Sequence, residues 1–527
     1  MTFDEQAAIL DRNGIVELLI SNQQLATSIA ELSARNDALT RQVEWFKEQI
    51  FGSKSERRVP APDGSQPSLG EWVQGDTPAE ATTITIAEHR RRRGTEPREE
   101  GVKEGGLRFD ESVPVEEIRI PSPTPAADDE VVTEKTTYKL AQRPASYVVL
   151  KYVREVVKKR EDGTLSCPPA PTSVLGKSFA DVSLLAGLLI DKFRYHLPLY
   201  RQHQRMEAAG IRLARSTLTG LVHRTADLLQ PIYAAQLASV LKSRVLTMDE
   251  TPIKAGRKGH GGMKTAYFWP VYGDKDEVVF PFSPSRAGAM VREVLGEYCG
   301  VLISDGYQAY ERYAEQTHKV VHAQCWSHTR RQFVKAEDVE PELTTVALEF
   351  IRRLYDEEAE LKRKSLDDTK YIEQRAKRCK PIVDDFFAWL VKTIDERLLL
   401  PSNPFTDAAG YALDREAALR VFLEFPNVPI DTNHLEREIR PIALGRKNWL
   451  FCWTEVGAEC VGIVQSLLAT CRLQGVDPYT YLVDVLQRVD DHPVAEVAKL
   501  TPRLWKEHFA GDPLRSDIDR RVQNAVA

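Results

Sequence analysis

The sequence has no apolar run long enough to cross a membrane. A transmembrane helix needs roughly 18 consecutive apolar residues, and charged or polar residues interrupt this 527-residue chain before that length is reached. The first residues, MTFDEQAAILDRNG, are acidic and lack the basic and apolar regions of a secretory signal peptide. We therefore expect a cytoplasmic protein that does not bind membranes.

Cysteine is also scarce. The seven cysteines are scattered along the chain, and no two of them form a Cys-x-x-Cys pair. Small secreted domains carry a dense cysteine framework, and structural zinc modules use closely spaced pairs of ligands. The sequence therefore favours a reducing compartment, and no zinc site is predicted.

The chain lacks an excess of positive charge. Its formal net charge is −6, which excludes a uniformly basic coat, although nucleic-acid binding depends on local patches. Between residues 192 and 224 a single acidic residue accompanies seven basic ones, which are Lys192, Arg194, Arg201, Arg205, Arg212, Arg215 and Arg224. A run of four arginines at residues 90–93 is either a solvated charge cluster or a second place that grips phosphates.

Within residues 1–56 the chain carries a heptad repeat, over residues 15–50. One repeat position holds Ile15, Asn22, Ile29, Asn36, Val43 and Ile50, and the position three residues later holds Leu18, Leu25, Leu32, Leu39 and Phe46. A strict seven-residue spacing keeps an apolar seam against a partner helix, and β-branched residues combined with leucine favour two parallel strands. The repeat predicts a coiled coil that makes a homodimer or higher oligomer. The alternative is a long helix packed on its own domain.

The next two segments differ in character. Residues 57–106 are rich in proline, glycine and glutamate, which is typical of a flexible linker. Residues 107–170 form a small β-rich module, in which residues 147–159, YVVLKYVREVVKK, have the β-branched enrichment of a strand. Its one cysteine is Cys167.

Residues 171–240 have a helix-turn-helix pattern. A helix over residues 197–210 ends at Gly210, and a second helix begins near Ser216, which can cap it. Helix, short turn and helix is the layout that places a recognition helix on DNA. The candidate DNA contacts at the start of the second helix are Arg215, Thr217 and Arg224. A plain antiparallel helix pair is the alternative, and the local positive charge favours DNA.

From residue 241 to residue 340, short apolar strands alternate with helices. Strands are predicted at residues 244–250, 265–273, 277–283, 300–310 and 318–325, and helices at residues 286–298 and after residue 325. This is the element order of a ribonuclease H-like mixed sheet. A helical insertion follows over residues 341–425, with an amphipathic period at Ile382, Phe386, Leu390 and Ile394. The core resumes over residues 426–454, and residues 455–527 form a C-terminal helical element.

Two aspartates follow strands of this core. Asp249 and Asp305 each come directly after an apolar run, and ligands of open α/β sheets collect at the carboxyl ends of strands. If the two strands are neighbours, the carboxylates meet, and their mutual repulsion favours a bound cation. Mg²⁺, with Mn²⁺ as a substitute, is the hard cation suited to carboxylate and phosphate oxygens.

A third acid, Glu436, lies in a basic segment over residues 431–451. Asp431 or Thr432 can cap the helix that begins there. The polar and basic residues around Glu436 are Asn433, Arg437, Arg440, Arg446 and Lys447. The alternative is a surface helix in which Glu436 and Arg440 form an ordinary i,i+4 pair.

Together these motifs resemble transposases of the insertion sequence 66 family, a D-D-E type. Residues 249–252, Asp-Glu-Thr-Pro, and residues 305–307, Asp-Gly-Tyr, look like its first two acidic motifs, and residues 433–449 resemble its third and most specific motif. Residues 325–331, CWSHTRR, match a further signature, and residues 51–57 resemble its N-terminal region. The family's cysteine-rich zinc-binding module lacks its cysteines in this chain.

The resemblance implies a multidomain bacterial enzyme that cleaves and joins double-stranded DNA at element ends and target, associated with the nucleoid when bound. Asp249, Asp305 and Glu436 would hold two Mg²⁺ ions, and Arg330 and Arg331 would join the DNA contacts. Glu250 is expected on the opposite face of its strand. Two small accessory proteins are implied as partners. The alternatives are a catalytically inactive DNA-binding protein derived from a transposase and a ribonuclease H-like nuclease acting on hybrids or junctions.

Overall fold

The computed structural model describes residues 107–109, 111, 113–120, 130–143, 146–158, 165–176, 178–258, 262–396, 402–448, 452 and 454–519. All of these belong to the second of two compact units, residues 96–527. The predicted coiled coil over residues 15–50, the linker and the arginine run at residues 90–93 lie outside the described residues, as does the side chain of Lys447.

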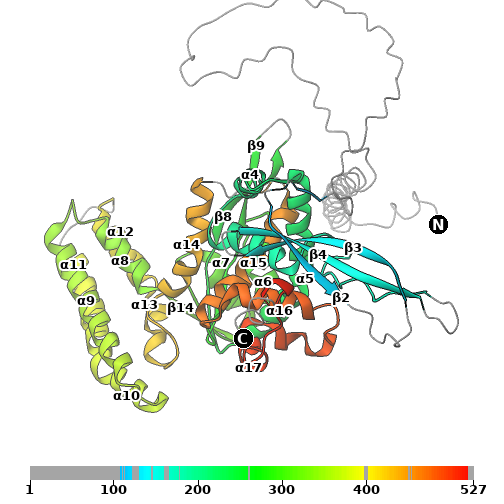
Figure 1. The fold of residues 1–527 in the computed structure, drawn as a ribbon. Helices are drawn as coiled ribbons and strands as arrows, with labels where there is room; N and C mark the ends of the chain where they lie inside the picture. The colour runs from blue at the N-terminus through cyan, green and yellow to red at the C-terminus, as the bar shows by residue number, and fades with distance from the viewer. Residues whose placement is uncertain are drawn as a thin grey trace, which may run out of the picture. The chain divides into compact units, whose positions relative to one another are not determined.

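The unit is built around a five-stranded mixed sheet (Figure 1). Its strands are β7 (Val245–Met248), β10 (Val271–Gly273), β11 (Glu277–Val279), β13 (Gly300–Ser304) and β14 (Val320–Gln324). The spatial order is β11-β10-β7-β13-β14, in which β10 is antiparallel to β11 and β7, whereas β13 is parallel to β7 and β14. The strands form from near-continuous apolar runs because both faces of the sheet are covered.

Alternate residues of β7 face the two sides of this sheet. Leu246 and Met248 pack in one core, whereas Val245 packs in another with Ile303 of β13. Helices α6 (Ala289–Leu295) and α7 (Gln308–Thr317) share the core on the first side, and α8 (Trp326–Val334) shares the core on the second. Because successive side chains of a strand point to opposite faces, the alternation along β7 also sets the face to which each residue after Met248 points.

A second sheet has three strands, β8 (Thr251–Lys258), β9 (Gly262–Phe268) and β12 (Phe282–Ser283), in the order β12-β9-β8. The sequence predicted single strands over residues 265–273 and 277–283, and this was wrong. Each of them breaks at a proline, Pro270 or Pro281, and its two halves belong to different sheets. Proline has no N–H for the ladder, so neither strand can continue straight through it. Strand β8 was not predicted.

The described residues between 341 and 423 are mostly helical (Figure 1). The elements are α9 (Pro341–Arg363), α10 (Asp368–Arg378), α11 (Lys380–Glu396), α12 (Pro404–Leu413), α13 (Glu416–Arg420) and a 3₁₀ turn, Val421–Leu423. Ile382, Phe386 and Leu390 are buried, so the predicted apolar face of α11 is confirmed. Arg375 lies inside this bundle and is bound by Glu358 at 2.8 Å.

The N-terminal part of the unit begins with β1 (Arg108–Phe109) and a sheet of β2 (Val115–Ile120), β3 (Glu130–Arg143), β4 (Ser146–Lys158) and β5 (Leu165–Ser166). Strand β4 confirms the strand predicted at residues 147–159. The helices that follow are α3 (Val182–Leu189), continued by a π-helical turn (Ile190–Arg194), α4 (Leu199–Ala208) and α5 (Arg215–Val240).

The predicted helix-turn-helix segment differs from the expectation in two respects. Helix α4 does end before Gly210, which has a positive φ of 83°. However, Ser216 is not a cap, because α5 begins after Ala214, which makes no capping hydrogen bond with its side chain. The connection is also not a free turn, since it forms strand β6 (Ile211–Arg212), which pairs with β1.

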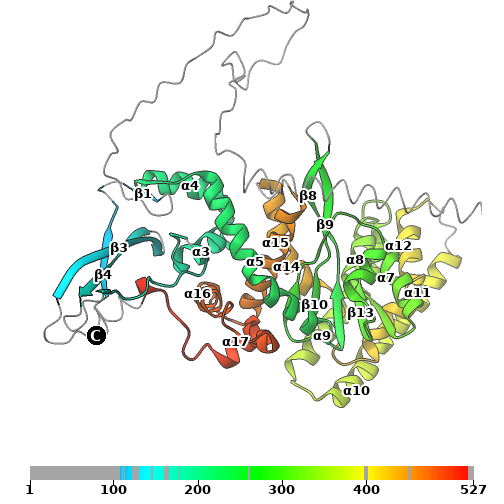
Figure 2. The same ribbon diagram turned by 90° about the vertical axis from the view of Figure 1, so that its right-hand side faces the viewer.

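The remaining helices are α14 (Asn433–Asn448), α15 (Glu455–Leu473), α16 (Pro478–Arg488) and α17 (Pro502–His508), with a 3₁₀ helix, Val494–Leu500. Helix α15 lies beside α5, as Figure 2 shows, and packs on β11. Gln236 of α5 fixes this contact, because its Nε2 donates to Thr470 Oγ1 at 2.8 Å. Helix α15 is the one described helix long and apolar enough for a membrane span, and most of it is buried within the protein.

Candidate active site

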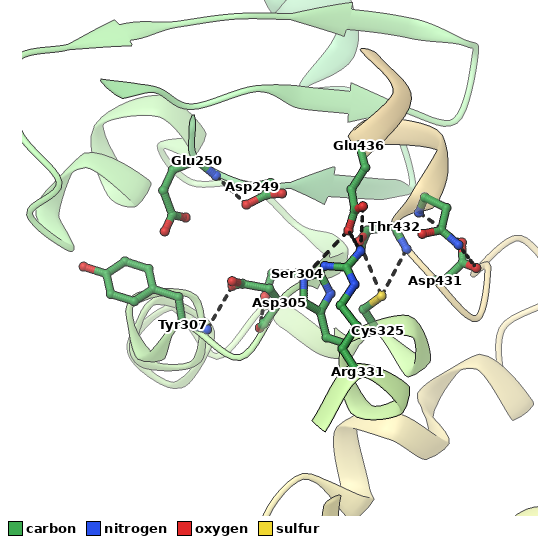
Figure 3. A network of polar contacts seen from close by, with 12 residues as sticks. Asp249, Glu250, Ser304, Asp305, Tyr307, Cys325, Arg331, Asp431, Thr432 and Glu436 are labelled. Atoms are coloured by element: carbon green, nitrogen blue, oxygen red, sulfur yellow. Dashed lines mark hydrogen bonds and ion pairs between the residues drawn. The ribbon is translucent and has the colours of Figure 1, made fainter. Parts of the chain in front are cut away.

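The two predicted aspartates come from neighbouring strands. Asp249 follows β7 and Asp305 follows β13, and these strands pair in parallel, with Ile303 opposite Thr247. Both aspartates continue the alternation of the sheet face that carries Val245 and Ile303. Figure 3 shows them with Glu436, which α14 brings to the same region. The structure therefore brings the three acids together.

Asp249 is a half-buried carboxyl with three other acids nearby. Its pKa is raised to about 8, first by burial and then by the charges of Asp305, Glu250 and Glu436. A hydrogen bond of 2.7 Å from the Glu250 backbone N–H to Asp249 Oδ1 only partly opposes this effect. A carboxyl with such a pKa is mostly protonated at neutral pH unless a cation takes the place of the proton.

The Asp305 loop is held by its own backbone and by a distant helix. The N–H of Tyr307 donates to Asp305 Oδ1 at 2.9 Å, which fixes the carboxylate. A Cβ on Gly306 would lie 2.5 Å from the hydroxyl of Tyr411 in α12. A larger residue at position 306 would therefore displace the Tyr411 side chain of the helical insertion.

Glu436 is bound by a guanidinium. Arg331 Nη2 donates to both oxygens of Glu436, at 2.6 and 2.7 Å, and Figure 3 shows the two side chains pointing toward each other. His328 Nε2 lies 3.7 Å from the same carboxylate, but burial and the nearby Arg331 lower the pKa of His328, which keeps its ring neutral. The alternative pairing of Glu436 with Arg440 is not seen among the described ion pairs.

The CWSHTRR segment also anchors the start of α14. Cys325 is buried, and its Sγ accepts hydrogen bonds from the backbone N–H of Thr432 at 3.3 Å and from its hydroxyl at 3.4 Å. Asp431 caps the helix as predicted, because its Oδ1 accepts from the N–H of Asn433 at 3.0 Å. Residues 325–331 therefore position Glu436 in two ways. Cys325 holds the start of α14 through Thr432, and Arg331 binds the Glu436 carboxylate directly.

The donor set suits a divalent cation only in part. Asp249 and Asp305 supply the hard oxygen ligands that Mg²⁺ prefers, and burial together with the neighbouring carboxylates raises the pKa of Asp249, so a cation there would replace a proton. Glu436, in contrast, is taken by Arg331. Within the described ranges no three acidic, histidine or cysteine side chains are already gathered as a metal site. The two aspartates fit a metal, and Glu436 fits once it leaves Arg331.

Some of the side chains predicted to contact DNA on α14 are exposed, and others make hydrogen bonds within the protein. Arg437 and Arg440 are exposed, whereas Asn433 Nδ2 donates to Asp431 at 2.6 Å. Arg446 is exposed as well, and its Nη1 donates at 3.0 Å both to Thr251 Oγ1 and to the carbonyl oxygen of Pro252.

The other predicted contacts lie on α8 and α5. Arg330 and its neighbour Arg331 are both exposed, and Arg331 is the one that pairs with Glu436. On α5, Arg215 lies over the ring of Tyr200 at 5.1 Å, Thr217 is half-buried, and Arg224 is exposed with a 3.3 Å bond to the Gly176 carbonyl oxygen.

Sequence reasoning missed the role of Glu250. It does point away from the sheet face of Asp249, toward α7, where its Oε2 accepts from the Tyr310 hydroxyl at 2.8 Å. Its Oε1 binds Arg286, which lies in the loop before α6. No signal in the sequence connects these residues, because they lie 36 positions apart on different elements.

Comparison with known proteins places the chain in a class defined by this kind of site. Residues 177–460 match the model of the Transposase IS66 family, residues 466–503 match the IS66 C-terminal element, and residues 38–118 match "Transposase C of IS166 homeodomain". The chain belongs to the IS66 transposase family. This membership implies a DNA-binding nucleotidyl transferase, of a type that typically uses a divalent metal ion.

Similar full-length relatives carry no functional description. The chain is 30% identical over 499 residues to the uncharacterized protein y4hP of Sinorhizobium fredii, covering 90% of this chain and 89% of the relative. It is 29% identical over 399 residues to the uncharacterized protein y4jD of the same organism, covering 72% of this chain and 77% of the relative.

Proposed function

We propose that this protein is an active D-D-E transposase that binds the ends of its insertion sequence and catalyses DNA cleavage and strand transfer. The observation that carries the proposal is the convergence of Asp249, Asp305 and Glu436 from two adjacent parallel strands and a basic helix. The β11-β10-β7-β13-β14 order supports a ribonuclease H-like core, in which three antiparallel strands are followed by two parallel ones.

Asp249 and Asp305 are the residues that would hold Mg²⁺ or Mn²⁺, and Glu436 would complete the set. When bound, such cations activate the attacking oxygen and stabilise the leaving oxygen of a phosphodiester. In cleavage, water attacks the phosphorus and the bond to a 3′ oxygen breaks, which leaves a 3′-OH. In strand transfer, that 3′-OH attacks a target phosphodiester and the displaced strand leaves with its own 3′-OH.

Other residues of the chain would bind the DNA. The exposed cations Arg437, Arg440 and Arg446 lie on the same helix as Glu436, and guanidinium groups suit phosphate oxygens. Lys447, Arg330 and Asn433 extend this set. The start of α5, with Arg215, Thr217 and Arg224, would contact the duplex further away. We further propose a homodimer or higher oligomer and small accessory proteins as partners.

The test is cleavage of duplexes that cover the DNA on each side of the coding sequence, with Mg²⁺ present and an unrelated duplex as control. Asp249→Asn, Asp305→Asn and Glu436→Gln should each abolish cleavage and leave DNA binding intact, because they keep the side-chain shape but remove the charge that attracts the cation. Binding without cleavage by the wild-type chain would support the inactive DNA-binding alternative instead.

Two other acids test the choice of Glu436. Glu424 is exposed, and Glu438 is buried and paired with Arg472. Glu424→Gln should cleave like the wild type, and Glu438→Gln should lose stability rather than cleavage activity per folded molecule. An active Glu436→Gln variant beside an inactive Glu424→Gln or Glu438→Gln variant would contradict the assignment. Glu250→Gln is not a neutral control, because Glu250 binds Arg286.

A further inference from the structure

Arg286 lies in a loop that is held by a hydrogen bond within the loop and by another from Tyr307. The loop connects β12 with α6, and within it the N–H of Ser285 donates to Ser283 Oγ at 3.1 Å. The Tyr307 hydroxyl donates to the carbonyl oxygen of Arg286 at 2.9 Å. The backbone of Arg286 is therefore fixed to the loop that follows Asp305.

The side chain of Arg286 is fixed as well. Its Nε and Nη2 donate to Glu250 Oε1 at 3.0 and 2.5 Å. Its guanidinium lies over the ring of Tyr307 at 4.7 Å and near the ring of Tyr267 at 6.0 Å. Even so, 51% of the Arg286 side chain is exposed, whereas only 4% of the Glu250 side chain is.

Glu250 is the buried anchor of this arrangement. The hydroxyl of Tyr310 donates to its second oxygen at 2.8 Å. Tyr310 is fully buried, and burial together with the Glu250 charge raises its pKa far above the ordinary value, so the phenol remains a donor. With both carboxylate oxygens occupied, Glu250 holds Arg286 in one place.

We propose that Arg286 binds a phosphodiester of the DNA strand that enters the site between Asp249 and Asp305. An arginine has five N–H donors in a planar fork, and the described hydrogen bonds of the Arg286 side chain use Nε and Nη2, which leaves Nη1 available on a side chain that is 51% exposed. Both of its anchors adjoin an acid of the site, since Glu250 follows Asp249 and Tyr307 lies two residues after Asp305. The inference rests on the proposed function, whose substrate it extends.

A second guanidinium, that of Arg446, is bound by the residues directly after Glu250. Arg446 of α14 donates to Thr251 and Pro252, the residues that follow Glu250. The segment from residue 250 to residue 252 thus fixes one cation from the loop before α6 and one from α14. Arg286 and Arg446 are thus two guanidinium groups held in fixed positions. They suit a DNA strand in which the phosphates on either side of the reacting phosphate need a positive charge close by.

A purely structural ion pair is the competing interpretation, and the salt dependence of DNA binding separates the two. Binding of the full chain to a labelled flanking-DNA duplex is measured over a range of salt, with Ca²⁺ to prevent cleavage. Arg286→Ala should weaken binding and lower the slope of log K against log salt by about one unit, as expected for one lost phosphate contact. Arg286→Lys should restore most of the slope but less of the affinity, because lysine keeps the charge without the fork.

The matched control is Arg292→Ala. Arg292 is an exposed arginine on the adjoining helix α6, where it bonds to the neutral side chain of Gln316. The inference is overturned if Arg286→Ala keeps the wild-type slope, or if Arg292→Ala lowers it equally. Failure of the proposed catalysis is seen separately, as absence of wild-type cleavage that depends on Asp249, and it leaves the slope comparison intact.

Discussion

At the scale of single residues, Arg331 binds the Glu436 carboxylate, which a bound metal ion would need as a ligand. Its guanidinium binds both oxygens of Glu436, so a cation that recruits Glu436 has to displace it. We expect Arg331→Ala to bind Mn²⁺ several-fold more tightly than the wild type in calorimetric titrations without DNA, and Arg331→Lys to lie between them. The neighbouring Arg330→Ala serves as control, because Arg330 is an exposed arginine of the same helix and the described ion pair with Glu436 belongs to Arg331. Equal or weaker Mn²⁺ binding by Arg331→Ala would show that this ion pair does not compete with metal.

His322 gives the site region a predictable dependence on pH. Burial and the nearby Arg415 lower its pKa to about 4, and its Nε2 lies 2.9 Å from Ser304 Oγ. Because the folded state binds this proton less readily than the unfolded chain, the stabilisation is complete above the ordinary pKa of about 6.5 and is lost as the pH falls toward 4.

The corresponding experiment compares thermal unfolding of the wild type and His322→Gln between pH 7 and pH 4. The wild type should lose more stability over this range, by at most about 3 kcal/mol. His508→Gln, at an exposed histidine, should follow the wild type. Parallel curves for wild type and His322→Gln would contradict the assignment. His434, whose pKa burial also lowers to about 4, contributes to the acid sensitivity that remains, as do His196, His223 and His328, whose pKa values burial lowers too.

At the scale of elements, the start of α5 carries the prediction for duplex binding. Arg215 and Arg224 are exposed near the N-terminus of a helix of 26 residues. Arg215→Ala or Arg224→Ala should weaken binding and reduce its salt slope by about one unit per lost phosphate contact. Lys242→Ala, just beyond the other end of α5, should bind normally. If both arginine variants bind like the wild type in anisotropy titrations, α5 is not a DNA-contacting helix.

The elements also show what the sequence could and could not predict. Apolar runs located β7, β13 and β14 because buried parallel strands are apolar on both faces, and this was enough to bring Asp249 and Asp305 together. Pro270 and Pro281 are the sequence features at which the two predicted strands break, because proline has no N–H for the ladder. The bonds from Arg331 to Glu436 and from Arg286 to Glu250 could not be predicted, because they join residues 105 and 36 positions apart on different elements.

At the scale of the whole molecule, the heptad repeat predicts how many chains act together. Residues 15–50 should form a parallel dimeric helix, which sedimentation equilibrium of this segment can detect. Asn22→Leu combined with Asn36→Leu should raise its stability and loosen its choice of oligomer, because buried asparagines fix register at a cost in stability. A segment that stays monomeric at high micromolar concentration would exclude this assembly.

The close approach of Tyr411 to Gly306 joins two distant parts of the chain into one inherited unit. The hydroxyl of Tyr411 fills the space where a side chain at position 306 would begin, so the bundle of α9–α12 is not a cassette that can be exchanged freely between relatives. A chimaera that receives a foreign bundle keeps its acidic loop in place only if the incoming residue at position 411 leaves the same clearance. Substitutions at positions 306 and 411 are therefore expected to depend on each other.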